Sequence, residues 1–349
     1  MSILEKSLFH KLSKGSKHIP LKNAHLHQFT LALQHLKDLK HLTLKLPHIE
    51  SPNEAILSLF QTLQNLTQLH FLDLNFLDTS LSRTYLETLF NSIPSNNLTA
   101  FQLTLGYPPL KYTNIFSTVS AMEFGVEKIA SLWTGKPVSL FFGISKFSAL
   151  SSLHLEFMPF NISTQDFKQL SLNLTGLRQL SSLALTFPQF DSANNFEGLQ
   201  CLTSCFKDVI NLTGLDLSFK GLNVRDQEIN ILGSGLVGCK KLETLKVIVS
   251  GAEKLTEKSL DYLLGGIQGL KKTLKCLLLR FGLRREFEEK ALVELLQGLA
   301  VLKNLEDFKF VDDSASRGRL VWMDLPARLG KYQNLKHLRR FIINNCRYV

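Results

Sequence analysis

The sequence predicts an α/β solenoid in which a short strand and a helix recur about every thirty residues. A Leu-x-x-Leu-x-Leu block occurs ten times, and eight of the nine intervals between successive first positions lie within two residues of thirty. The chain of 349 residues is 44% hydrophobic and 20% charged, which provides enough apolar material for a large core. Together these observations exclude a disordered chain and favour a repeat architecture.

Each block predicts a strand, because Leu-x-Leu alternation puts both leucines on one face of an extended chain. Nine blocks begin at Leu39, Leu69, Leu98, Leu150, Leu180, Leu212, Leu242, Leu274 and Leu305, and a degenerate tenth reads Leu335-Leu338-Phe341. An aromatic residue often lies two positions beyond the block, where its parity predicts a core position. These aromatic residues are Phe76, Phe157, Phe187, Phe219 and Phe281, and Tyr107 has the same parity four positions beyond its block.

Segments between the strands carry apolar residues at helical spacing, most clearly in 56–63, 260–267 and 292–299. The residues Ser51-Pro52-Asn53-Glu54 form a helix-start pattern before the first of them. One strand and one helix cannot bury their apolar sides alone, so neighbouring units must stack on a shared core. Strands stack about 4.8 Å apart and helices need about 8–10 Å, so we expect a curved horseshoe with the strands on its concave face.

This pattern resembles the leucine-rich repeat family in its long-repeat, ribonuclease-inhibitor-like form, over residues 36–345. The resemblance implies about ten repeats, parallel strands on the concave face and helices on the convex face. One departure is clear, because the family usually places Asn or Cys three residues after the last strand leucine. Here those positions hold Leu77, Met158, Pro188, Lys220, Ser250 and Gly282, so the turn backbone must find other hydrogen-bond partners.

The predicted domains are a basic N-terminal cap (1–35), the solenoid (36–316), and a last repeat with a basic C-terminal cap (317–349). The interval of 52 residues between Leu98 and Leu150 indicates an insertion at about 106–138. Insertions in solenoids tend to lie on a surface used for binding. A lengthened convex segment or a hidden degenerate repeat explains the extra residues equally well.

The net charge of +10 is concentrated at the two ends of the chain. Residues 1–50 hold eight Lys and Arg against three Asp and Glu, and residues 251–349 hold nineteen against twelve. A polyanion would therefore meet the ends first, although solubilising caps are the simpler interpretation. The candidate polyanion contacts are Arg317, Arg319, Arg328, Lys331, Lys336 and Arg340.

Three patterns that could carry chemistry are interpreted as structural. Residues 233–238 read Gly-x-Gly-x-x-Gly but lie before a strand rather than after one, so we expect no dinucleotide there and a close approach of a helix end to the sheet instead. His25-x-His27 lacks further metal ligands, and Cys205 and Cys239 are expected in the core. We therefore predict no catalytic residues, no metal, no cofactor and no enzymatic activity.

The solvent-facing strand positions define the candidate concave binding face. Its residues are Lys45, Asp73, His154, Glu156, Asp216, Lys246, Arg280, Lys309 and Arg339. A large curved face with varied side chains suits another macromolecule. The favoured function is a non-enzymatic protein-binding scaffold or adaptor, an accessory subunit of a larger assembly that docks through this face, the insertion or the basic ends.

Two alternatives stay open: a ribonucleoprotein subunit that binds RNA phosphates through its basic termini, and, by family analogy, a substrate-recognition subunit of a ubiquitin ligase. Acidic protein tails could bind the same basic residues as RNA. We expect no transmembrane segment, because the longest uncharged run (88–110) contains prolines and asparagines. Five cysteines, an odd number, favour a reducing compartment, so an intracellular and cytoplasmic location is expected. The basic, acid-poor first twenty residues leave a mitochondrial location as the alternative.

Overall fold

The chain forms two compact units, Met1–Leu150 with His154–Phe160, and Ser151–Leu153 with Asn161–Val349. The structure is a computed structural model. It describes residues 23–46, 54–76, 81, 83–105, 143–157, 162–187, 192–220, 224–250, 252, 254–282, 289–312, 338–343 and 346–348. The boundary between the two units runs through strand β4 (Ser152–Phe157).

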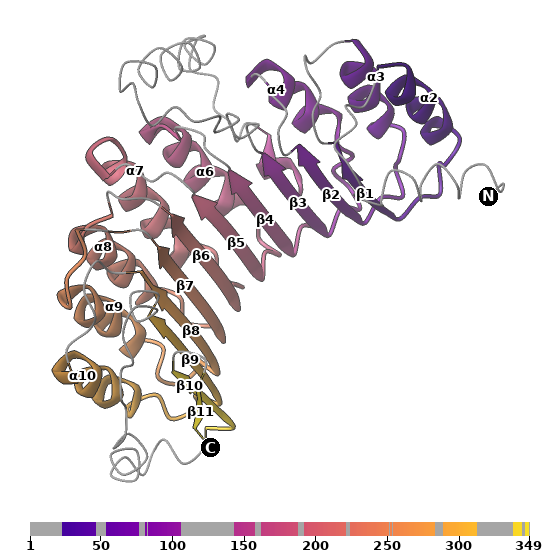
Figure 1. Ribbon diagram of the computed structural model, residues 1–349. Coiled ribbons are helices and arrows are strands. Elements are labelled where there is room, and N and C mark those ends of the chain that lie inside the picture. The colour runs from indigo at the N-terminus through magenta and orange to yellow at the C-terminus, as the bar shows by residue number, and fades with distance from the viewer. Residues whose placement is uncertain are drawn as a thin grey trace. The chain divides into compact units, whose positions relative to one another are not determined.

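The first unit alternates helices and strands, with the helices on one side of the strands (Figure 1). Strands β1, β2 and β3 pair in parallel, and helices α2, α3 and α4 pack in the same order. A 3₁₀ turn, η1, precedes β4. The elements are α2 (Asn23–Gln34), β1 (His41–Lys45), α3 (Glu54–Leu63), β2 (Phe71–Phe76), α4 (Arg83–Ser92), β3 (Ala100–Leu105) and η1 (Ile144–Lys146).

The second unit repeats the same arrangement. Strands β5 to β10 pair in parallel in chain order, and β11 closes this edge by pairing antiparallel with β10. The strands are β5 (Ser182–Phe187), β6 (Gly214–Lys220), β7 (Thr244–Ser250), β8 (Cys276–Phe281), β9 (Asp307–Asp312), β10 (Arg340–Ile343) and β11 (Cys346–Tyr348). The helices are α6 (Thr164–Gly176), α7 (Ser192–Cys205), η2 (Phe206–Asp208), α8 (Asp226–Leu236), α9 (Lys258–Gln268) and α10 (Glu289–Leu299).

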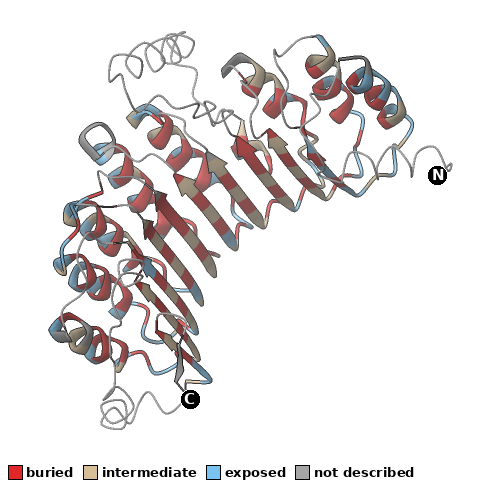
Figure 2. Ribbon diagram, in the orientation of Figure 1, coloured by how far each residue is buried: buried red, intermediate tan, exposed pale blue. Residues whose placement is uncertain are grey.

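The strand leucines form continuous rows beneath each sheet. In the second unit Leu183, Leu215, Leu245 and Leu277 are direct neighbours in the register, and each is at most 2% exposed. Buried bands alternate with half-buried ones along strands such as β2 and β7 in Figure 2. The strand-helix repeat with leucines on the inner strand positions confirms the predicted α/β leucine-rich-repeat solenoid. The ribonuclease-inhibitor-like form of the repeat stays a prediction.

The predicted aromatic positions are also in the core where the structure describes their side chains. Phe76, Phe187, Phe219 and Phe281 are all at most 2% exposed, and the rings of Phe187 and Phe219 stack with centroids 5.6 Å apart. Tyr107 lies outside the described residues. These aromatic rings fill the space between the strand ends and the helices, so they are not a surface for stacking ligands.

The tenth repeat has a different register from the predicted one. Phe341 pairs with Phe308 and Ile343 with Phe310, so the tenth block is Leu338-Phe341-Ile343 and not Leu335-Leu338-Phe341. Both alignments fit the sequence, because the block that begins at Leu335 and the block that begins at Leu338 each place apolar residues at the core positions. The parallel hydrogen bonding of β10 to β9 selects one of them, because a shift of register would turn the core side chains outward.

Helix α6 begins with a capping box. The hydroxyl of Ser163 accepts a hydrogen bond from the backbone N–H of Asp166 at 3.2 Å, and the Asp166 carboxylate accepts the Ser163 backbone N–H at 3.0 Å. Helix α8 uses a related contact, in which Glu228 accepts the backbone N–H of Arg225 at 2.8 Å. Both contacts satisfy donors that the first turn of a helix leaves unpaired.

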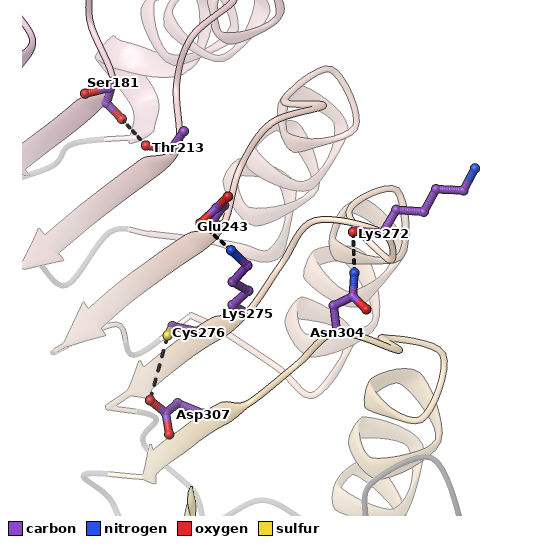
Figure 3. Close-up of polar contacts among 8 residues, drawn as sticks. All are labelled: Ser181, Thr213, Glu243, Lys272, Lys275, Cys276, Asn304 and Asp307. Carbon is purple, nitrogen blue, oxygen red and sulfur yellow. Dashed lines mark hydrogen bonds and ion pairs between the residues drawn. The ribbon is translucent and has the colours of Figure 1, made fainter. Parts of the chain in front are cut away.

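The edge of the sheet where each strand begins, called here the strand-start edge, is held by hydrogen bonds between neighbouring repeats. One carbonyl per repeat accepts two backbone N–H groups from the next repeat, as Ser181 does from Thr213 and Gly214. Side chains extend this contact. The hydroxyl of Thr213 also donates to the backbone carbonyl of Ser181, and the side-chain amide of Asn304 donates to the backbone carbonyl of Lys272 (Figure 3). The turns that carry Leu77, Met158 and Pro188 lie outside the described residues.

Charged pairs continue the strand-start edge toward the C-terminal repeats. Lys275 Nζ lies 2.9 Å from Glu243, and Arg339 Nε lies 3.4 Å from Glu306 (Figure 3 shows the first pair). Because these side chains belong to consecutive repeats, opposite charges alternate along the edge. Both pairs are exposed to solvent, and water and salt screen their attraction, so they mainly fit neighbouring repeats to one another.

The predicted domain limits are not tested by the described residues. The insertion at 106–138 lies wholly outside them, as does the boundary at 317. The helix-start pattern puts Pro52 at the first helical position, but residues 51–53 lie outside the described residues, and α3 is described from Glu54.

Candidate functional site

The outward-pointing residues of the strands, called here the strand face, are set by the same alternation that builds the core. In β7 the burial alternates between exposed or half-buried and buried residues from Thr244 to Ser250, and β5 shows the same pattern. The leucine rows fix the inner positions, so side chains of the strand face are free to differ from repeat to repeat. This is where the predicted concave residues lie, apart from Arg339.

In the first unit, three predicted residues come together on the strand face. Asp73 is half-buried on β2, and burial raises the pKa of its carboxyl above the usual range. The positive charges of Lys45 and His154 act in the opposite direction and favour the ionised form. Glu156 is half-buried two positions beyond His154 on β4. The cluster therefore holds a carboxyl that ionises less readily than a free aspartate.

An aromatic contact on the same face was not predicted. The rings of His41 and Phe71 lie 6.0 Å apart between β1 and β2, at outward positions of both strands. Each of these residues lies immediately before an inner leucine of its strand. The candidate residues were taken only from positions after that leucine.

In the second unit, Asp216 and Lys246 form an ion pair across β6 and β7 with the two charged atoms 2.6 Å apart. Lys246, Leu278 and Lys309 are neighbours in the register, and so are Ile248, Arg280 and Val311. Cations and aliphatic side chains therefore alternate both along and across three strands. The three aliphatic members lie at outward strand positions, as their parity predicts, but the candidate binding residues taken from the sequence were the polar ones.

The strand face of β5 and β6 has a different character. Its outward residues are small, namely Ser182, Ala184, Thr186, Gly214 and Ser218 beside Asp216. Ser218 is only 4% exposed, and its hydroxyl has no hydrogen-bond partner. The small outward side chains of β5 and β6 thus lie beside the larger outward residues of β7, β8 and β9.

Arg339 does not belong to the strand face as predicted. It precedes β10 and pairs with Glu306 on the strand-start edge, whereas Ile342 occupies the position next to Lys309. The corrected register of the tenth repeat is the cause.

Of the predicted polyanion contacts, only Arg340 belongs to the described residues. Its Nε lies 3.6 Å from the carboxylate of Asp307, with both side chains partly exposed. Arg317, Arg319, Arg328, Lys331 and Lys336 lie outside the described residues.

The Gly-x-Gly-x-x-Gly pattern lies at the end of helix α8 and beyond it, as its position before a strand indicates. The glycines permit close contact with neighbouring helices rather than with the sheet, which corrects the expected approach. A methyl group on Gly233 would collide with the backbone of Tyr262 in α9, and one on Gly235 would lie 2.6 Å from the side chain of Thr203 in α7. The physical reason is that a helix in this fold has a helix on either side.

The residues considered as metal ligands have other surroundings. His25 and His27 lie in helix α2, not on a strand, and residues two apart on a helix point in different directions. Among the residues that the structure describes, no group of three His, Cys, Asp or Glu side chains could hold a metal ion.

Two cysteine thiols are buried as predicted. Burial raises the pKa of Cys205 and of Cys239 to about 12, so both thiols stay protonated at neutral pH. Cys276 is half-buried, and its sulfur donates to the carboxylate of Asp307 at 3.8 Å (Figure 3).

Within the described part of the chain, none of the helices has the length and apolar character needed to cross a membrane.

No protein-family model and no curated protein sequence matches this chain. Among solved structures it is similar to a chain of the Toll–Spatzle complex of Drosophila, at 14% identity and a TM-score of 0.36, over 81% of this chain and 29% of that one. It is also similar to internalin C2 of Listeria monocytogenes, at 14% identity and a TM-score of 0.29, over 91% of this chain and 88% of that one. The chain thus spans less than a third of the first of these proteins. At such identities and scores the fold assignment rests on the repeat geometry described above.

Proposed function

We propose that this protein is a non-enzymatic protein-binding scaffold, an accessory subunit of a larger intracellular assembly that holds its partner on the strand face. The observation that carries the proposal is the alternation of Lys246, Leu278 and Lys309 across three strands of one sheet. Half-buried aliphatic and cationic side chains on a regular backbone provide a surface whose binding energy can be concentrated in a few anchors.

The intracellular part of the proposal draws support from the cysteines. Cys201, Cys205, Cys239 and Cys276 are all free thiols, which suits a reducing compartment. Binding of RNA or acidic tails through the basic C-terminal residues depends on residues outside the described part, and it stays a prediction.

Site-directed photo-crosslinking tests the proposal. A benzoylphenylalanine residue at Leu278 places the reactive group on the strand face, whereas one at Gln268 places it at the exposed end of helix α9. In cells of the protein's own source, ultraviolet light should join the Leu278 variant to a defined protein and leave the Gln268 variant unjoined. The proposal is wrong if neither position yields a protein adduct, or if both positions yield the same adducts.

A further inference from the structure

Six side chains on β7, β8 and β9 form a mixed surface, called here the cation–aliphatic patch: Lys246, Ile248, Leu278, Arg280, Lys309 and Val311. Each strand contributes one cation and one aliphatic residue. The order is reversed on β8, so every cation has aliphatic neighbours on the adjoining strand. With strands about 4.8 Å apart, the patch is small enough for one protein segment to contact all six side chains.

Two cations of this patch, Lys246 and Lys309, differ in their surroundings. The carboxylate of Asp216 pairs with Lys246, with the charged atoms 2.6 Å apart. Within the described ranges Lys309 has no ion pair, and its side chain is half-buried beside Leu278 and Ile342. The ammonium group of Lys309 would gain a charge-assisted contact from an incoming carboxylate.

The aliphatic half of the patch is equally unusual for a strand face. Ile248, Leu278 and Val311 all point outward by the parity of their strands and all are half-buried. Covering these apolar side chains favours binding, but only of a partner that is itself apolar at those points. A partner that satisfies both halves must present carboxylates and aliphatic side chains close together.

We infer that the cation–aliphatic patch binds a protein segment in which Asp or Glu residues alternate with Val, Ile or Leu. This inference rests on the proposed function, and it names the chemistry of the partner and the three strands that bind it. A carboxylate of the segment contacts Lys309, and its aliphatic side chains cover Leu278, Ile248 and Val311. The small residues of β5 and β6 leave room beside the patch for the segment to continue over the sheet.

The chemistry of the patch favours a protein segment over a nucleic acid. Phosphates would meet the cations, but nothing in RNA matches aliphatic side chains placed between those cations. RNA-binding sheets instead present aromatic side chains on which bases stack. The six residues of this patch include no aromatic side chain.

A displayed library of random twelve-residue peptides, selected on the purified full-length protein, tests the inference. We expect the selected peptides to be enriched in Asp and Glu together with Val, Ile and Leu. The best of them, made as a fluorescent synthetic peptide, should bind the wild-type chain and lose affinity as salt concentration rises.

Four variants assign the binding to the patch. Lys309→Glu and Leu278→Asp change one cation and one aliphatic side chain of the patch, and each should weaken binding by about tenfold or more. Lys303→Glu and Val301→Asp make the same chemical changes at exposed positions in the turn after helix α10, and they should bind as the wild type does. Circular dichroism spectra and melting curves of all four variants exclude loss of binding through unfolding.

Several outcomes would overturn the inference. One is a selected set without enrichment of acidic residues, and another is equal binding by the patch variants and the control variants. A single-stranded uridine oligonucleotide can be tested as a competitor of the peptide. If it displaces the peptide and binds more tightly than the peptide does, the patch binds RNA instead. If crosslinking at Leu278 still identifies a protein partner while the peptides lack acidic residues, only the partner chemistry is wrong. Failure of both experiments overturns the proposed function as well.

Discussion

Replacing either of two adjacent glycines in helix α9 with alanine should change stability in opposite directions. Gly265 lies on the exposed side of the helix, and a methyl group added there meets no atom within 4 Å. Gly266 faces helix α8, where a methyl group would lie 2.6 Å from the carbonyl carbon and the Cα of Gly233 and would collide with its carbonyl oxygen. The two substitutions add the same atoms to the same helix, so helix propensity is matched between them.

The expected magnitudes follow from these surroundings. Gly265→Ala should stabilise the protein by about 0.5–1 kcal/mol, because alanine has less freedom to lose in the helix. Gly266→Ala gains the same helix propensity, but carbon atoms prefer separations of about 3.5–4.0 Å, so the two helices must move apart by about 1 Å. Overpacking of this kind costs about 1–3 kcal/mol, and here the obstacle is backbone that has no alternative rotamer. The net effect should be a loss of about 1–2 kcal/mol.

Urea unfolding followed by circular dichroism measures both effects, with the wild type as reference. In a thermal melt, a unit of this size should shift by about 2–4 °C for each kcal/mol. If Gly266→Ala is as stable as Gly265→Ala, the backbones of α8 and α9 are not in contact at Gly233. The account of the Gly-x-Gly-x-x-Gly pattern as a helix-packing feature would then be wrong.

Four further changes test other parts of the structure. Ser218→Ala should raise stability by about 1 kcal/mol in urea unfolding, because it removes a buried hydroxyl that has no partner; an unchanged or lower midpoint would show that the hydroxyl is bonded. Asp73→Asn should raise the unfolding midpoint at pH 7 and not at pH 3: burial raises the pKa of Asp73, so its ionisation costs the folded state stability as pH rises through that raised pKa. Asn304→Ala removes the amide contact to the preceding repeat, 2.6 Å long, and should cost about 0.5–1 kcal/mol in the same assay. Cys205 and Cys239 should resist iodoacetamide at pH 8 until urea unfolds the chain, since burial raises the pKa of each thiol to about 12; peptide mapping by mass spectrometry would contradict this if either is alkylated in the folded protein.

The repeat could be predicted from the sequence because its signal is periodic and repeated many times. A single block is weak evidence, but ten blocks, with eight of nine intervals near thirty residues, leave little choice of strand position or of the inward face. The prediction failed where the repeat was degenerate. Leu335, Leu338 and Phe341 fit the block by type, and only the pairing of Phe341 with Phe308 shows that the true block begins three residues later.

The candidate site was predicted less well, for a physical reason. The outward parity of Lys246, Lys309 and Arg280 follows from the leucines, so these residues could be placed on the strand face. Their value as a surface depends on what stands beside them on the next strand, and the sequence does not show that Asp216 pairs with Lys246 while Lys309 has no ion pair within the described part of the chain.

By itself, the sequence of this protein determined which residues are buried along each strand, because the inward positions of every repeat have to match the same apolar core. The tertiary structure alone decided which residues become neighbours across repeats. The contact of Gly233 with α9, the ion pair of Arg339 and the partners of Lys309 all join residues about thirty positions apart. Such contacts depend on the register between strands, and register is a property of the stacked chain that no single repeat contains.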